Sequence, residues 1–139
     1  MGRSVLVSLS FACAVGCSSE EPVCAPVARD CAPLYEPTYD ALFRRTLNPS
    51  CGVAGSTCHQ SPGAGTALGL AFDSPDGAYA ALLDDSRSWR RVVPNNPECS
   101  KIVHKITSHD AHVVMPPGRP LSGPEQCVII RWIANGAAR

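Results

Sequence analysis

Four side chains of this sequence have the chemistry needed to hold an iron porphyrin. Cys51 precedes the dipeptide Cys58-His59, and Met115 follows downstream in a Met-Pro-Pro-Gly run. Two thiols can form thioethers with the vinyl groups of a haem, while an imidazole and a thioether can occupy the two axial positions of its iron. These residue types therefore indicate a site for a covalently bound haem c.

The spacing of the two cysteines leaves a second interpretation open. Six residues separate Cys51 from Cys58, whereas the common haem attachment motif has two. Seven positions along a helix would place the thiols about 10 Å apart, so both reach one haem only if the segment 52–57 bulges out. Two glycines in that segment allow such a loop. The alternative is a disulfide between Cys51 and Cys58, with His59 on the surface.

Met115 favours the haem interpretation. A rigid loop with few N–H donors is well suited to aim a thioether at iron. The ordinary alternative is that the methionine fills a gap in the core. His109 and His112 are rival sixth ligands, and His104 lies on the polar side of its expected helix, where we interpret it as solvated.

The first residues indicate export. Arg3 and an uncharged run over 4–15 have the proportions of a signal peptide, and Ala-Val-Gly before Cys17 resembles a lipobox, in which the cysteine is lipidated. We expect a signal peptide over 1–16, a flexible tether over 17–36 and one domain over 37–139. The alternative is an ordinary secretion signal with Cys17 as a chance thiol. The expected location is the periplasm or cell surface, with an anchor in the bacterial outer membrane.

Six cysteines remain after Cys13 and Cys17 are assigned to the leader and the lipid anchor. Export favours disulfides, and six is compatible with three bridges or with two bridges plus two haem thioethers. We expect a local bridge between Cys24 and Cys31. A second bridge, between Cys99 and Cys127, would close a loop of about thirty residues and contribute roughly 3.5 kcal/mol. A zinc site at Cys51, Cys58 and His59 matches no common spacing.

The bulk composition narrows the class of protein. The chain has 139 residues, zero formal net charge and only 6% aromatic residues, with 13 prolines and 11 glycines. One compact domain fits this length, and a core built from protein alone would be modest. Without a basic stripe, nucleic acid is not an expected partner. No catalytic triad, paired carboxylate or phosphate loop indicates an enzyme.

Apolar spacing and capping residues predict an all-α fold of about four helices with long loops. The first helix opens at Pro37-Thr38 and ends at Asn48-Pro49. The second starts after Ser74 with Pro75 at its first position, and the third starts after Asn96 with Pro97. The last begins at Ser122, where Glu125 completes a capping box, and runs to Gly136.

In this order the segments resemble the cytochrome c superfamily, and within it the planctomycete-type cytochrome C domains of bacterial secreted proteins and lipoproteins. The resemblance covers about residues 39–137 and includes the following series: Leu42-Phe43, Cys51, Cys58-His59, Leu68-Gly69-Leu70, Val93-Pro94-Asn95-Asn96-Pro97, Met115-Pro116-Pro117-Gly118, Leu121-Ser122 and Arg131-Trp132-Ile133. It implies that Cys51 and Cys58 form the haem thioethers, that His59 is the proximal ligand and that Met115 is the distal ligand.

The function expected on this basis is one-electron transfer by an exported cytochrome with His and Met axial ligands. Its redox partner is not indicated by the sequence, and its membrane contact would be the lipid anchor. The alternative is a structural or interaction lipoprotein that keeps the fold without haem. Three disulfides would stabilise that protein: Cys24 to Cys31, Cys51 to Cys58 and Cys99 to Cys127.

Overall fold

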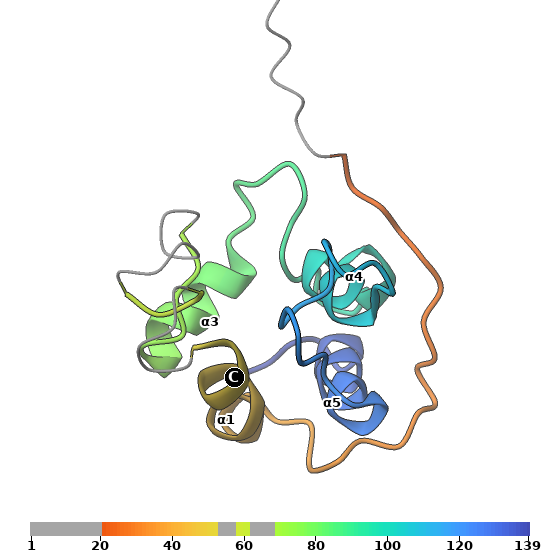
Figure 1. Ribbon diagram of the computed structural model, residues 1–139, viewed down its shortest axis with the longest axis horizontal. Helices are drawn as coiled ribbons and strands as arrows, with labels where there is room; N and C mark the ends of the chain where they lie inside the picture. The colour runs from red at the N-terminus through yellow and green to blue at the C-terminus, as the bar shows by residue number, and fades with distance from the viewer. Residues whose placement is uncertain (1–20, 53–57, 62–68) are drawn as a thin grey trace, which may run out of the picture.

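The computed structural model describes residues 21–52, 58–61 and 69–139. Cys13, Cys17, the expected signal peptide and most of the segment between Cys51 and Cys58 therefore lie outside the described residues. Within them the chain contains four α-helices, one π-helix, one 3-10 helix and no strand, so the predicted all-α fold is confirmed. None of the described helices has the length and hydropathy required to span a bilayer. Figure 1 shows α1, α3, α4 and α5 grouped around a common centre.

The first helix begins as predicted but continues past its expected end. Thr38 caps α1 (Tyr39–Leu42) by accepting a hydrogen bond from the Ala41 N–H. The chain then passes into the π-helix η1 (Phe43–Cys51), which contains Pro49. In a π-turn each N–H bonds the carbonyl five residues back, as the Gly52 N–H does with Leu47 at 3.0 Å. The wider turn carries the chain past the proline and places Cys51 at the helix end.

The second helix, α3 (Pro75–Leu83), starts where the sequence predicts. Ser74 accepts a hydrogen bond from the Gly77 N–H at 3.2 Å, and Pro75 occupies the first turn, where it needs no donor. The Tyr39 hydroxyl donates to the Pro75 carbonyl at 2.6 Å, which ties α3 to α1. This bond fixes two helices that are 36 residues apart in sequence.

The third predicted helix is divided in two. The 3-10 helix η2 (Pro97–Cys99) ends at Ser100, whose extended backbone interrupts the helix before α4 (Lys101–Thr107). Ser100 is fully buried; its hydroxyl donates to the Asn96 carbonyl at 2.8 Å and accepts from the Val93 N–H at 2.9 Å. Serine thus satisfies nearby backbone groups in place of helical bonds, which explains the break.

The last helix, α5 (Gly123–Ala134), is the centre of the core. Its capping box is confirmed, since the Ser122 N–H donates to the Glu125 carboxylate at 2.8 Å. The helix packs against α1, α4 and η2. Trp132 lies against Tyr39, with ring centroids 5.6 Å apart, and is almost fully buried. The apolar face of α5 therefore joins the beginning and the end of the folded chain.

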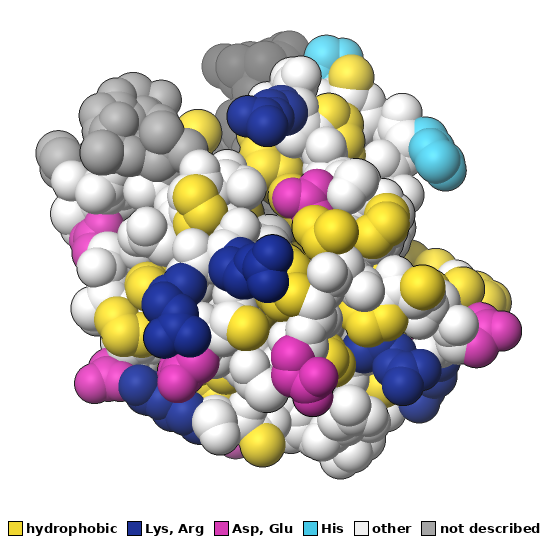
Figure 2. All heavy atoms as spheres, turned by 90° about the horizontal axis from the view of Figure 1, so that it is seen from below, with side chains coloured by type: hydrophobic (Ala, Val, Ile, Leu, Met, Phe, Trp, Pro, Cys, Tyr) yellow, Lys and Arg dark blue, Asp and Glu magenta, His cyan; other side chains and the backbone are white. Residues whose placement is uncertain are grey.

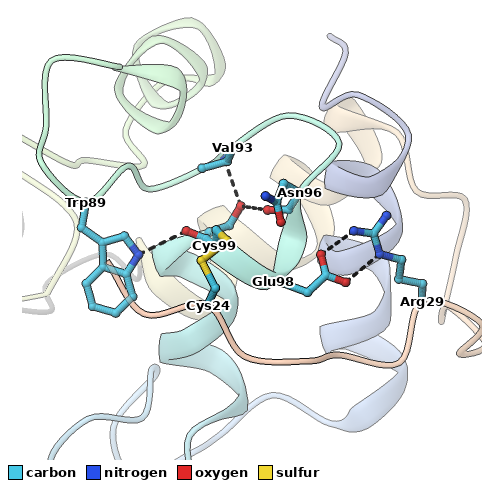
Figure 3. Close-up of a disulfide and its surroundings, with 8 residues drawn as sticks. Cys24, Arg29, Trp89, Val93, Asn96, Glu98 and Cys99 are labelled. Carbon is cyan, nitrogen blue, oxygen red and sulfur yellow. Dashed lines mark hydrogen bonds and ion pairs between the residues drawn. A yellow bond between two sulfur atoms is a disulfide. The ribbon is translucent and has the colours of Figure 1, made fainter. Parts of the chain in front are cut away.

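The segment 21–38 runs around the outside of α4 and α5 before it enters α1 (Figure 1). We call this segment the strap. It contains no helix and is mostly exposed. The Ala25 N–H donates to the Glu98 carbonyl at 3.0 Å, and the Arg29 side chain pairs with the Glu98 carboxylate (Figure 3). The strap is therefore attached to η2 by backbone and side chain.

Two disulfides fasten the strap, and their pairing corrects our prediction. Cys24 is bonded to Cys99 and Cys31 to Cys127, with sequence separations of 75 and 96 residues. The expected pairs Cys24 to Cys31 and Cys99 to Cys127 were wrong. The strap lies extended across η2 and α5, so each of its cysteines meets a different helical cysteine and the two do not meet each other.

Charged side chains of both signs share the surface. Figure 2 shows lysine and arginine side chains interspersed with aspartate and glutamate over the face seen from below. This distribution agrees with the zero formal net charge of the chain. Neither sign of charge dominates this face.

Candidate functional site

The candidate site is a cavity of about 490 Å³ lined by segments that are far apart in sequence. Cys51, Cys58, His59 and Met115 all line it, together with apolar side chains such as Leu47, Phe72, Leu82, Ile102, Ile106 and Ile129. The volume lies within the range of small-molecule and cofactor sites. The structure thus brings together all four residues that the sequence selected for haem chemistry.

His59 is held in a defined orientation within this cavity. Its Nδ1 lies 3.1 Å from the Leu70 carbonyl oxygen, and its ring packs against Phe72 with centroids 5.5 Å apart. Its carbonyl accepts a hydrogen bond from the Phe72 N–H at 2.7 Å. With Nδ1–H donating to the Leu70 carbonyl, Nε2 keeps its lone pair, which is the arrangement found in metal-binding histidines.

Gly52 allows the close approach of the segment that carries Phe72. A Cβ atom at this position would lie 2.8 Å from the Phe72 Cβ and 3.2 Å from the Asn48 oxygen. The Asn48 side chain also donates to the Phe72 carbonyl at 3.0 Å. The end of η1 is therefore in direct contact with Phe72, on which the ring of His59 packs. This contact fixes the position of Cys51 relative to the imidazole.

Cys51 and Cys58 both remain as thiols in the structure, so the third disulfide of the alternative interpretation is not formed. Burial raises the pKa of Cys51 to about 12, with a smaller contribution from Cys58. Cys58 is exposed. The cavity thus presents one protected thiol and one accessible thiol.

Met115 lines the cavity from the loop that follows α4. Its N–H donates to the Lys105 carbonyl at 3.0 Å, which anchors the loop to α4. The side chain is 36% exposed, so it is not a filler of the protein core. With Pro116 and Pro117 it forms part of the cavity wall. The thioether is therefore available to a ligand.

The other histidines lie elsewhere among the described residues. His109 and His112 are exposed, and His109 borders a second, more polar hollow next to Thr107 and Gln126. The ring of His104 packs on Trp89, with centroids 5.1 Å apart, outside the described lining of the main cavity. The structure thus associates Met115, and neither rival histidine, with the cavity.

Sequence reasoning missed one side of the site. Trp89, Arg87, Arg91, Lys101 and Lys105 also line the cavity. The segment 84–96 has no helical or strand period, so its side chains could not be assigned to a face. Lys101 and Lys105 are four positions apart in α4, a spacing that places both on one side of the helix.

The strap supports this same side of the cavity. The indole N–H of Trp89 donates to the Cys99 carbonyl at 3.2 Å, directly beside the Cys24–Cys99 bridge (Figure 3). Trp89 is buried, and the Lys101 ammonium lies 5.2 Å from the centre of its ring. The bridge therefore fixes the backbone that positions the tryptophan in the cavity wall.

A family model described as Planctomycete cytochrome C matches residues 56–118. The chain is similar to planctomycete cytochrome C. The predicted resemblance is confirmed over this range, which includes Cys58, His59 and Met115 and begins after Cys51. No curated protein and no solved structure matches the chain.

Proposed function

We propose that the protein binds a haem c and carries single electrons. The observation that carries this proposal is the placement of His59 in a mainly apolar cavity that Cys51, Cys58 and Met115 also line, with Nδ1 of the imidazole held by the Leu70 carbonyl. That hydrogen bond leaves Nε2 as the donor atom for iron. The similarity to planctomycete cytochrome C supports the same function.

The residues of the cavity fit the proposed group. Cys58 and Cys51 would carry the thioethers, His59 would be the proximal ligand and Met115 the distal ligand. Haem would supply a one-electron couple, whose potential a Met ligand and an apolar surrounding raise. The protein residues hold the imidazole orientation, shield the porphyrin faces with apolar side chains and leave Met115 partly open to solvent. We infer an electron carrier in preference to an enzyme.

The alternative is a structural or interaction protein with this fold and no haem. The two disulfides of the strap fit that alternative equally well. The cavity favours haem, because a protein stabilised only by disulfides has no need of a mainly apolar hollow of this size between its helices.

The location and partners belong to the same proposal. We propose that the signal peptide directs export to the periplasm or cell surface, that Cys17 carries the lipid anchor and that a separate redox protein exchanges electrons with the haem. Covalent disulfides persist in such a compartment. The anchor would keep the domain at the outer membrane surface.

The test is expression of the full chain in a bacterial periplasm together with a haem attachment system. We expect a reduced haem absorption spectrum and a covalent mass increase of one haem, and the mass increase should be lost in Cys51→Ala/Cys58→Ala. In His59→Ala the axial absorption features should be lost, whereas the matched control His104→Ala should retain them. Met115→Ala should keep the covalent haem and lower its midpoint potential. A colourless protein of unmodified mass would refute the proposal.

A further inference from the structure

Part of the cavity lining is basic. Arg87, Arg91, Lys101 and Lys105 line it, and the described lining residues include no aspartate or glutamate. The remaining wall is mainly apolar. A cavity of this kind matches an occupant with an apolar body and acidic groups on one edge, because buried positive charge is stabilised by a negative partner.

Arg91 is the most buried of these cations, with 7% of its surface exposed. Its Nη1 donates to the Ala81 carbonyl at 2.7 Å, which fixes the guanidinium in the wall beside α3. Burial lowers the pKa of Arg91, and the positive charge of Arg87 lowers it further. The guanidinium carries five N–H donors in a planar fork, a geometry suited to a carboxylate.

Arg87 converges on the same place from the rim of the cavity. Its Nε pairs with Asp84 at 3.2 Å, and both side chains are partly exposed. A Cβ atom built on Gly69 would lie 3.0 Å from Nη2 of Arg87 and 3.8 Å from Nη2 of Arg91. Both guanidinium groups therefore reach one point next to Gly69. Asp84 offsets part of this positive charge, and an anion next to Gly69 would stabilise the two guanidinium groups further.

We propose that Arg87 and Arg91 form a carboxylate-binding pair that fixes the acidic edge of the occupant next to Gly69. This inference rests on the proposed function: for haem, the carboxylates are the two propionates. The pair then determines which edge of the porphyrin is held inside the protein. Lys101 and Lys105 add positive charge on the α4 side of the same cavity.

The test compares two iron porphyrins that differ only in their carboxylates, iron protoporphyrin IX and its dimethyl ester. Each is titrated into the full chain, exported without a haem attachment system so that the strap disulfides form, and binding is followed by absorbance. We expect the diacid to bind at least about tenfold more tightly than the diester, as charge-assisted hydrogen bonds imply. Arg91→Gln should reduce this ratio towards one, and Arg87→Gln should reduce it in part.

The matched control is Arg131→Gln. Arg131 also donates to a backbone carbonyl, that of Arg29 at 2.9 Å, but lies outside the described lining of the cavity. The control should keep the full preference for the diacid. The comparison in the unsubstituted chain and the variant at the partly exposed Arg87 remain informative even if Arg91→Gln fails to fold.

The outcomes separate this inference from the proposed function. Equal affinity for diacid and diester in the unsubstituted chain would overturn the carboxylate pair and leave haem binding standing. A preference that survives in Arg87→Gln and Arg91→Gln alike would also overturn the assignment. Failure of both porphyrins to bind would overturn the proposed function together with this inference.

Discussion

Substitution of Cys24 by serine tests the attachment of the strap directly. The structure pairs Cys24 with Cys99, whereas the local spacing of the sequence favours a pair with Cys31. In Cys24→Ser the thiol released should therefore be that of Cys99. Alkylation under native and then denaturing conditions, followed by peptide mass mapping, identifies the labelled cysteine. A label on Cys31 would refute the observed pairing.

The contribution of each bridge to the free energy of unfolding follows from the length of the loop that it closes. A bridge that spans 75 residues removes about 4.5 kcal/mol of loop entropy from the unfolded chain when it acts alone. With Cys31–Cys127 intact, the Cys24–Cys99 bridge closes a ring of only about 35 residues, which consists of the segments 24–31 and 99–127. Its contribution is then about 3.8 kcal/mol in the same model. A local Cys24–Cys31 bridge would contribute about 2.4 kcal/mol.

Urea unfolding of Cys24→Ser/Cys99→Ser measures this contribution. We expect the free energy of unfolding to fall by about 4 kcal/mol, with the other bridge verified by mass. The matched double variant Cys31→Ser/Cys127→Ser removes the other bridge of the same ring. Its free energy of unfolding should fall by a similar amount. A loss below about 1 kcal/mol in both variants would contradict the loop-entropy reasoning.

Three further predictions concern the folded domain without haem. Gly52→Ala should reduce the free energy of unfolding by about 1–3 kcal/mol, because the added Cβ would collide with Phe72. The control Gly123→Ala, where a Cβ would meet nothing within 4 Å, should not destabilise the protein. Equal effects of the two substitutions would contradict the steric argument. Because burial raises the pKa of Cys51 to about 12, the thiol stays protonated in the folded protein above pH 9 but loses its proton on unfolding. The free energy of unfolding should therefore fall between pH 9 and 10 by up to about 1.4 kcal/mol. This dependence on pH should be reduced in Cys51→Ala. Ser100→Ala should cost about 1–3 kcal/mol in urea unfolding, because it leaves buried backbone groups without their partner; an unchanged midpoint would refute this.

The elements that local chemistry determines were predictable from the sequence. The starts of α3 and α5 depend on side chains that bond their own first turn, so Ser74 and the Ser122/Glu125 pair identified them. The π-helix through Pro49 was not predictable, because a proline normally ends a regular helix and nothing local signals the wider turn. The break of the third helix at Ser100 was not predictable either, because its partner Val93 becomes a neighbour only in the folded chain.

The residues of the candidate site likewise divide into those that the sequence could predict and those that it could not. Cys51, Cys58, His59 and Met115 could be selected because their side-chain chemistry is unusual and points to one cofactor. The Leu70 carbonyl that orients His59 could not be selected, since every residue has a carbonyl. Arg87 and Arg91 belong to an irregular segment, and only the fold turns both towards Gly69. The disulfide partners likewise depend on the path of the strap across the helices.

The pairing of the strap with the far end of the chain also sets an order of events during synthesis. As the chain emerges from its N-terminus, Cys24 and Cys31 appear first, and their native partners follow only 75 and 96 residues later. In that interval Cys51 and Cys58 emerge and are the nearest thiols available for incorrect bridges. Correct maturation therefore requires that oxidation be delayed or errors be reshuffled, and early capture of Cys51 and Cys58 by a cofactor would remove two competitors. The same two thiols thus link assembly of the site to the fidelity of folding.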